Sequence, residues 1–321
     1  MIYVPKYQDI SVEEPIDIGG YGIGGEWRIK RYNVNGDMDL DTGWFPNLIT
    51  NLGLTNLCAA PNALNYWTIG SSATAPAITD TNMGSFLKWI SASTGIPIVR
   101  TVSGSPDYIL AETRSQRWNA GVGENGTIRE LGLGTNTTGG GLGVHTAVSP
   151  EVTKADDQVV DIFYRMRLYP DLIDRTGTVS ISGTSYNFIA RGSEYDANPN
   201  FITVINAGMY EGGYNFHTVY DGDIGASVIT SPSGSSDIST TGLSPVKVSS
   251  GLGTRNYYAF WNVDDGNFGG GIRSCKTRTQ FYGNTGGGTQ VRFGNISGDT
   301  TIPKTNQQSL KLNFLITMTR H

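Results

Sequence analysis

The sequence predicts an all-β protein with two antiparallel β-sandwich-like domains, an extended N-terminal arm and one short helix. Glycine makes up 43 of the 321 residues, about twice its usual share, which suits short strands joined by many turns. Hydrophobic residues form 38% of the chain, enough to bury a core in one or two domains. Apolar side chains recur at every second position in residues 160–168 and 310–318, and a period of two is that of a strand with one buried face.

These two stretches also match each other. KADDQVVDIFYRMRLY (154–169) and KTNQQSLKLNFLITMT (304–319) align without a gap, placing Lys154 on Lys304 and Gln158 on Gln308. Upstream of each, GTIRELGL (126–133) resembles GGIRSCKT (270–277). The matches predict that the two β domains are copies of one another; the alternative is the chance likeness of any two amphipathic strands.

The first 26 residues show no regular apolar periodicity, as in EEPIDIGGYGIGGE. We expect an extended attachment arm, because a segment with little apolar surface becomes ordered by lying on a neighbouring subunit; a disordered terminus is the alternative. The arm's apolar side chains are its candidate assembly contacts: Tyr3, Tyr7, Ile16, Ile18, Tyr21 and Ile23. The expected division is residues 1–26 for the arm, 27–172 for the first β domain and 173–321 for the second.

Residues 27–44, WRIKRYNVNGDMDLDTGW, predict a β-hairpin with Asn35-Gly36 in a two-residue type I′ turn. A two-residue turn places apolar and charged side chains on opposite faces. The apolar face would hold Trp27, Ile29, Met38, Leu40 and Trp44, and the other Lys30, Asp37, Asp39 and Asp41.

Residues 45–60, FPNLITNLGLTNLCAA, are the best helix candidate, with Leu48, Ile49 and Leu52 on the apolar side. The next stretch, 67–87, is rich in Gly, Ser, Thr and Ala and predicts a strand connection rather than a phosphate loop. Asp80 and Thr81 would make local turn bonds there. Met83, Phe86 and Leu87 would then enter the core.

No motif for catalysis, cofactor binding or metal binding is found. No Gly-Lys pair exists for a phosphate loop, and no amphipathic helix follows the glycine runs at 19–25 and 139–143. The chain has three histidines, no G-x-S-x-G elbow and no HExxH motif. The sequences DGD (221–223) and DDG (264–266) fit ordinary turns better than calcium sites. We therefore expect no enzyme activity, no cofactor and no metal.

Charge and apolar patterning limit the partners. A net charge of −5, with no basic cluster longer than RIKR (28–31), argues against a nucleic-acid partner. No run of 18 apolar residues and no signal-peptide pattern is found, so we expect no membrane insertion. Cys58 and Cys275 form no CxxC pair and are expected to be thiols of a protein made in a reducing cytoplasm.

Four segments occur in an order that resembles tail fibres and related tail or collar proteins of tailed bacteriophages. They are WFPNLITNLGLTNL (44–57), IGSSATAPAITDTNMGSFL (69–87), GTIRELGLG (126–134) and DQVVDIFYRMRLYP (157–170). The C-terminal IPKTNQQSLKLNFLITMTRH (302–321) is similar to the closing strand of such proteins. The resemblance covers most of residues 27–170 and, more loosely, 250–321; residues 171–251 match nothing in it.

This resemblance implies a non-enzymatic virion protein, made in the host cytoplasm and built from β-sandwiches. Its implied partners are further copies of itself, as a trimer if it is a fibre, and other tail or collar proteins. The arm and first domain would join the particle, and the second domain would project or pack against neighbours.

The alternative function is a carbohydrate-binding or carbohydrate-cleaving receptor protein for a host surface glycan. Cleavage would need a positioned pair of acids, and Glu211, Asp221, Asp264 and Asp265 do not differ from solvated turn acids. Aromatic side chains in 209–220 and 256–261 could stack on sugar rings, although such clusters also fill cores or subunit interfaces. The candidate contacts are Tyr210, Tyr214, Phe216, Tyr257, Tyr258 and Trp261.

Overall fold

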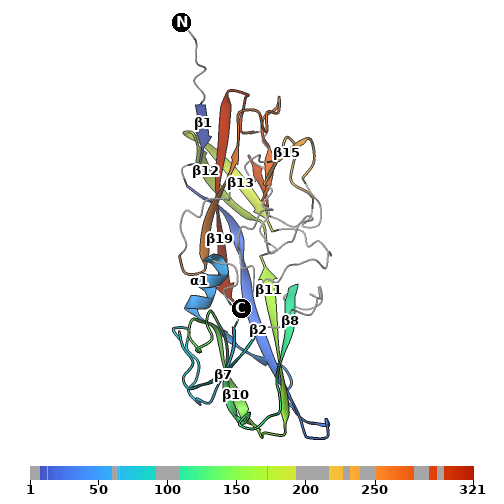
Figure 1. Cartoon of the computed structure of the whole chain (residues 1–321). Coiled ribbons are helices and arrows are strands. Elements are labelled where there is room, and N and C mark those ends of the chain that lie inside the picture. The colour runs from blue at the N-terminus through green and yellow to red at the C-terminus, as the bar shows by residue number, and fades with distance from the viewer. Residues whose placement is uncertain are drawn as a thin grey trace. The chain divides into compact units, whose positions relative to one another are not determined.

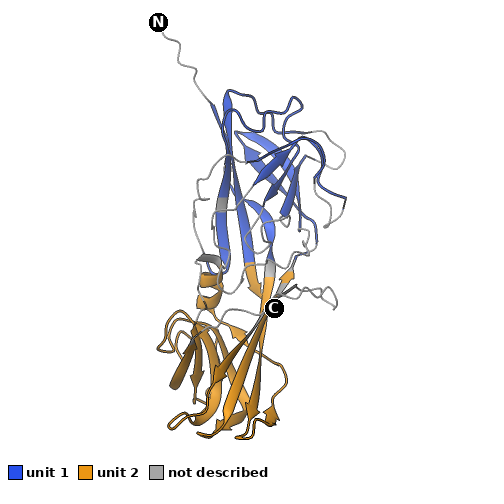
Figure 2. Ribbon diagram, turned by 45° about the vertical axis from the view of Figure 1, so that its right-hand side comes forward, with its two compact units in different colours: residues 1–20, 171–198, 211–317 blue, residues 21–170, 199–210, 318–321 orange. Residues whose placement is uncertain are grey.

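The computed structural model describes residues 8–12, 14–59, 64, 66–91, 109–171, 173–192, 217–226, 232–238, 251–277, 289–294 and 300–321. The chain is all-β, as predicted, with one helix in its described part (Figure 1). It divides into two compact units (Figure 2): unit 1 holds residues 1–20, 171–198 and 211–317, and unit 2 holds 21–170, 199–210 and 318–321. Both β2 and β19 therefore begin in unit 1 and end in unit 2. The expected division into consecutive segments, 1–26, 27–172 and 173–321, does not allow for strands that the two units share.

Unit 2 contains two antiparallel sheets. In the first, β11 (Val159–Pro170) lies between β8 (Ile109–Trp118) and β2 (Ile16–Tyr32), and β3 (Met38–Asp41) and β4 (Phe45–Pro46) also pair with β2. The second has the order β5-β10-β9-β6-β7. Its strands are Leu48–Ile49, Leu142–Lys154, Gly126–Gly134, Tyr66–Gly70 and Phe86–Ser91, respectively.

Aromatic side chains join the two sheets of unit 2. Trp27 of β2 and Tyr164 of β11 are completely buried, and Trp67 of β6 is 2% exposed. The Trp27 ring centroid lies 5.1 Å from that of Trp67 and 4.7 Å from that of Tyr164. Since the three side chains come from both sheets, their contacts define the core of a β-sandwich.

Unit 1 is built in the same way. One ladder places β19 (Gln308–Arg320) between β16 (Thr254–Trp261), which is antiparallel to it, and β1 (Gln8–Ser11), which is parallel. The other sheet is antiparallel and has the order β12-β13-β18-β17-β14-β15. Its strands are Arg175–Ile181, Thr184–Arg191, Thr289–Phe293, Ser274–Thr277, Thr218–Tyr220 and Ser236–Ile238, respectively.

The two units repeat one topology. The order β5-β10-β9-β6-β7 in unit 2 corresponds strand for strand to β13-β18-β17-β14-β15 in unit 1, and the pair β8-β11 corresponds to β16-β19. The seven strands also follow each other along the chain in the same sequence. The duplication inferred from the two alternating stretches is therefore present as a duplication of strand order.

Individual cross-strand residue pairs also correspond between the two units. In unit 2 Trp118 is the cross-strand partner of Val160, and in unit 1 Trp261 is the partner of Leu310. The repeat alignment places Val160 on Leu310. Contacts between the sheets also correspond: the Trp67 and Tyr164 rings are 6.3 Å apart, and so are the rings of His217 and Phe314.

The lysine and glutamine shared by the repeats have the same structural roles. Lys154 and Lys304 are 1% and 4% exposed, and each amine donates to backbone carbonyls of a nearby loop. Four residues later, each glutamine closes the turn that starts its strand. The Gln158 Oε1 accepts the Ala155 N–H at 2.8 Å, and the Gln308 Oε1 accepts the Thr305 N–H at 3.0 Å.

The prediction that residues 1–26 form an attachment arm is wrong for those of them that the structure describes, because they form β1 and the first part of β2. Ile16, Ile18 and Ile23 are at most 4% exposed and belong to the chain's own core. Buried positions are even-numbered before Gly19 and odd-numbered from Ile23 onward, and Gly19 has a φ of +93°. This change of parity, which a left-handed glycine allows, conceals the strand period from a sequence search. Tyr21 lies in β2, while Tyr3 and Tyr7 lie outside the described residues.

Deleting residues 1–25 is therefore expected to abolish cooperative unfolding, because the deletion removes β1 and the buried isoleucines at the start of β2. Thermal unfolding followed by circular dichroism tests this. Deletion of residues 1–7, which precede β1, is the control and should keep a cooperative transition. A normal transition in the longer deletion would show that the first half of β2 is dispensable.

The hairpin is present, but its turn is not the predicted two-residue one. The Asn33 N–H donates to the Asp37 carbonyl and the Gly36 N–H donates to the Asn33 carbonyl, both at 2.9 Å. With a φ of +83° at Gly36, this is a three-residue loop with a bulge. Lys30 pairs with Asp41 and Arg31 with Leu40, but Met38, which was expected on the buried apolar face, is 51% exposed.

An ion pair on this hairpin gives a pH-dependent prediction. The hydrogen bond from Arg28, assisted by the Gly43 N–H and opposed by burial, lowers the pKa of Asp41 to about 2. A lowered pKa contributes stability above the unfolded value of 3.8 that is lost as the pH falls through about 2. Asp41→Asn should therefore cost about 1 kcal/mol at pH 7, after allowance for solvent screening, and nothing below pH 2. Urea unfolding at several pH values measures this; a cost independent of pH would contradict it.

The helix is shorter than predicted and buries a different face. Leu48 and Ile49 form β5, and α1 runs over Asn51–Ala59. Thr50 caps the helix, because its Oγ1 accepts the Gly53 N–H at 2.9 Å. The buried leucines of α1 are Leu54 and Leu57, whereas Leu52 is only half-buried.

Candidate functional site

Glu130, in the middle of β9, is a buried carboxylate with four partners. It is 1% exposed. Its Oε1 accepts the backbone N–H groups of Ser85 at 2.7 Å and Ser72 at 3.2 Å, and its Oε2 accepts that of Gly84 at 3.0 Å. The fourth partner is the His145 Nε2, 3.0 Å from Oε2. These contacts compensate for the loss of hydration that burial of a charge requires.

His145 extends this network from the adjacent strand β10 to Asp80. The imidazole is buried, and its Nδ1 lies 2.7 Å from the Asp80 Oδ2. Burial raises the pKa of Asp80, but the hydrogen bonds from the Ala77 N–H and from His145 outweigh it, so the pKa is lowered. We call Asp80, Glu130 and His145 the clamp, because together they fix both ends of the connection between β6 and β7.

The clamp is suited to holding a loop rather than to catalysis. Both ring nitrogens of His145 are already within hydrogen-bonding distance of carboxylates. Both nitrogens are therefore directed at side chains of the same unit rather than at a cavity. The Asp80 N–H also donates to the Ala77 carbonyl at 3.0 Å, so the local turn bonds expected at Asp80 are present.

The clamp was not predicted from the sequence, because its three residues come from separate segments and match no motif. One signal was available: Glu130 is the only acid in the strand segment GTIRELGLG and directly precedes the apolar residues LGL. Acidic side chains are almost never fully buried without a partner. A lone acid in a buried strand thus predicts a polar network nearby, although not its members.

The strand that follows the clamped connection, β7, is an edge strand with exposed apolar side chains. Phe86, Leu87 and Trp89 are 39%, 41% and 41% exposed, and Ile78 in the connection is 44% exposed. The expectation that Phe86 and Leu87 enter the core is wrong, because β7 is the last strand of its sheet in the described chain. Met83 is buried, as expected.

Lys88, the one charged residue of β7, contacts residues of its own unit. The Lys88 amine forms an ion pair with Glu124 and lies 5.7 Å from the centroid of the Trp118 ring. We call the three exposed apolar side chains of this edge strand, Phe86, Leu87 and Trp89, the β7 edge. Apolar residues that gather on a surface mark interaction sites more often than isolated ones do.

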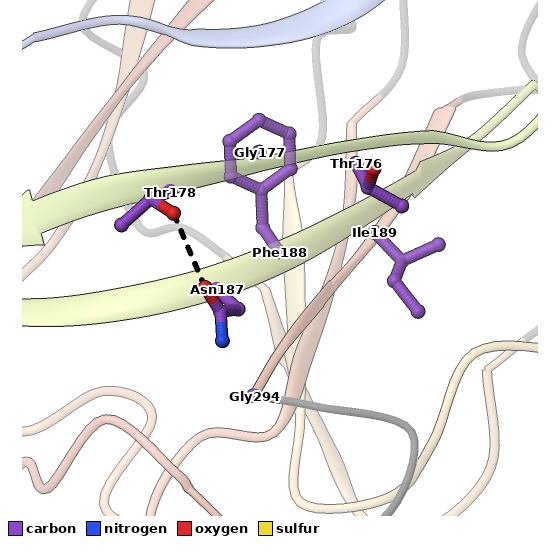
Figure 3. A pocket seen from close by; sticks show the side chains of 7 residues that line it. All are labelled: Thr176, Gly177, Thr178, Asn187, Phe188, Ile189 and Gly294. Atoms are coloured by element: carbon purple, nitrogen blue, oxygen red, sulfur yellow. Dashed lines mark hydrogen bonds between the residues drawn. The ribbon is translucent and has the colours of Figure 1, made fainter.

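A cavity lies along β12 and β13 of unit 1 (Figure 3). Its volume is about 410 Å³, and it is lined by Thr176, Gly177, Thr178, Asn187, Phe188, Ile189 and Gly294. The Phe188 ring covers Gly177, where a Cβ atom would lie 2.7 Å from it. The Thr178 hydroxyl donates to the Asn187 Oδ1 at 3.1 Å. No lining residue is titratable, so the cavity lining offers no acid or base.

The proposed sugar contacts are not gathered on one described surface. Trp261 is fully buried, so its assignment as a surface contact is wrong; it packs in the core because it lies on the inner face of β16. Tyr258 is half-buried, with the Lys311 amine 4.1 Å from its ring centroid. Tyr257 belongs to β16. Tyr210, Tyr214 and Phe216 lie outside the described residues.

Two of the acidic residues considered for glycan cleavage, Asp221 and Asp265, accept hydrogen bonds from backbone N–H groups of their own chain. The Asp221 Oδ1 accepts the Ser235 N–H at 2.7 Å, and the Asp265 Oδ2 accepts the Asn262 N–H at 3.1 Å. Within the described ranges, no three His, Cys, Asp or Glu side chains gather in a way that could hold a metal ion. In the same ranges no helix has both the length and the apolar character of a membrane span.

Comparisons of the chain with protein-family models, with curated protein sequences and with solved structures give no match.

Proposed function

We propose that this chain is a non-enzymatic structural subunit of a tailed-bacteriophage particle, a component of a tail fibre or of a tail or collar appendage. The observation that carries the proposal is the β7 edge, the exposed apolar side chains of an edge strand. The buried clamp holds the start of this strand in place. A surface of this kind suits permanent contact with another protein subunit.

The position of the phage-like segments supports the same function. Residues 44–57, 69–87, 126–134 and 157–170 all belong to unit 2. They cover β4, β5, most of α1, the clamped connection, β9 and all of β11. These four segments thus lie in one folded module, which also carries the β7 edge, whereas the looser match at residues 302–321 lies mostly in unit 1. Unit 2 is the part that we propose to join the particle, in place of the N-terminal arm.

A disrupted coding region tests this proposal. Phage whose coding region for this chain carries an early stop codon should yield particles that lack one appendage and are less infectious. Adding the purified chain to these particles should restore infectivity. A synonymous change at the same codon is the control. Particles of unchanged composition and infectivity would contradict the proposal.

A further inference from the structure

The outer face of the first sheet of unit 2 carries more positive than negative charge. We call it the basic face; it is formed by the outward side chains of β2, β11 and β8, which alternate with the buried ones, and by Asp41 of β3. The chain as a whole has a net charge of −5, so this face is a positive region on an acidic protein. Its described charged side chains are five cations, Arg28, Lys30, Arg117, Arg165 and Arg167, and three acids, Glu26, Asp41 and Asp161.

Two of the acids are shared by three of the cations. The Asp161 carboxylate accepts the Arg117 Nε at 2.6 Å and the Arg117 Nη2 at 2.7 Å. Asp41 is bound in the same two-pronged way by Arg28. Lys30 is the cross-strand neighbour of both acids. Since each carboxylate already neutralises one arginine, this half of the face has one more positive than negative charge.

The third acid, Glu26, holds the other two arginines. The Arg165 Nε lies 2.5 Å and the Arg167 Nη2 lies 2.7 Å from the same oxygen, the Glu26 Oε2. One carboxylate thus neutralises one of two guanidinium groups. Arg165 also stacks on Trp44, with its Cζ 4.1 Å from the ring centroid. These contacts fix the positions of the guanidinium groups, and a preorganised site loses little conformational freedom when a partner binds.

The repeat shows that this fold does not require arginines at these positions. The alignment of residues 154–169 with 304–319 places Arg165 on Leu315 and Arg167 on Thr317. Both are half-buried outward positions of β19, the corresponding strand of unit 1. A strand in the same place of a sandwich with the same topology therefore forms with neutral side chains there. The two arginines of unit 2 are thus available for recognition.

We propose that the basic face binds an acidic segment of a different protein subunit through Asp and Glu carboxylates. The planar fork of a guanidinium group matches a carboxylate in geometry and charge. Arg165 and Arg167 are two residues apart on one strand, which separates them by about 6.6 Å. Carboxylates at every second residue of an extended segment have the same spacing. The surplus positive charge also draws an acidic partner to this face in preference to a basic one.

This inference rests on the proposed function for the place of the partner, which is the phage particle. It gives that function a contact of stated chemistry on unit 2, the part that we propose to join the particle. The binding itself is a property of the purified chain and can be measured separately.

Binding of labelled poly-L-glutamate to the full chain tests the chemistry. Fluorescence anisotropy should show saturable binding at about 50 mM salt that weakens as the salt concentration rises. The double variant R165Q/R167Q should raise the dissociation constant at least ~10-fold, because it removes two charge-assisted contacts. R165K/R167K keeps the charge and should bind more tightly than the glutamine variant. The matched control is Arg129→Gln, an exposed arginine of β9 that pairs with Glu151 and should bind as the wild type does.

Zero-length cross-linking of purified particles identifies the partner. A carbodiimide joins an amine to a carboxylate, so Lys30 should become linked to an Asp or Glu of a different particle protein. Lys30→Arg should remove this product. Circular dichroism of each purified variant confirms that it is folded, so that a lost contact is not a lost fold.

Three results would overturn the proposal. They are equal affinity of the wild type and R165Q/R167Q for poly-L-glutamate, binding of the wild type to dextran sulfate but not to poly-L-glutamate, and particles that contain the chain but give no link from Lys30 to a different protein. The second result would indicate an anionic polysaccharide as the ligand. If the chain does not enter particles, the particle role fails, and the poly-L-glutamate measurement still decides the chemistry of the basic face.

Discussion

Glu130→Ala should lower the free energy of unfolding by about 3–5 kcal/mol, the cost of removing one partner from a buried charged network. The substitution leaves the N–H groups of Ser72, Gly84 and Ser85 without their acceptor and His145 without one of its two carboxylates. Since whole domains are stable by only about 5–15 kcal/mol, the variant should unfold at a much lower urea concentration. Tryptophan fluorescence during urea unfolding measures the change.

Glu151→Ala is the matched control for Glu130. Glu151 lies in β10 of the same sheet, is exposed and pairs with Arg129 on the surface. Its loss should cost far less than the loss of Glu130, as is usual for exposed ion pairs. Equal costs for the two substitutions would show that the clamp does not stabilise unit 2.

Lys154→Met and Lys304→Met should each cost about 1–3 kcal/mol, because each removes the hydrogen-bond donor of several partly buried carbonyl groups. The Lys154 amine donates to the carbonyls of Glu124 and Ala155. The Lys304 amine donates to the carbonyls of Asp265 and Val263 and, at 2.9 Å, to the Asn267 Oδ1. Methionine fills a similar volume without donating, so the loss reports the hydrogen bonds rather than a cavity.

The two lysine variants together test the equivalence of the units. Urea unfolding of each should show a loss of similar size, whereas Lys311→Met, at an exposed position of β19, should cost under about 1 kcal/mol. Burial lowers the pKa of both Lys154 and Lys304. If one variant lost the expected free energy of unfolding and the other lost none, the shared lysine would have different structural roles in the two repeats.

The long strands were predictable because their periodicity is local. Val160, Ile162, Tyr164 and Met166 recur at every second position, and so do Leu310, Leu312, Phe314 and Ile316; all eight are buried. A strand with one face in the core requires this pattern whatever surrounds it. The repeat was predictable for the same reason, since the matching lysines and glutamines occupy the same turn in both units.

The features that escaped prediction depend on distant neighbours. The core role of Ile16 and Ile18 is hidden by the change of parity at Gly19. Phe86 and Leu87 read as core residues in sequence, and they are exposed because β7 is an edge strand, which only the assembled sheet determines. His145 joins Glu130 to Asp80, and no sequence spacing among the three residues indicates this contact.

Quantitative mass spectrometry of purified particles tests the central proposal, that this chain is a structural part of a phage particle. Particles of the phage that encodes the chain would be purified on a density gradient. Peptides from β11 and β19 should then follow the particle peak at a constant ratio to the other particle proteins. Abundant peptides in the infected-cell lysate with none in the particle fractions would contradict the proposal.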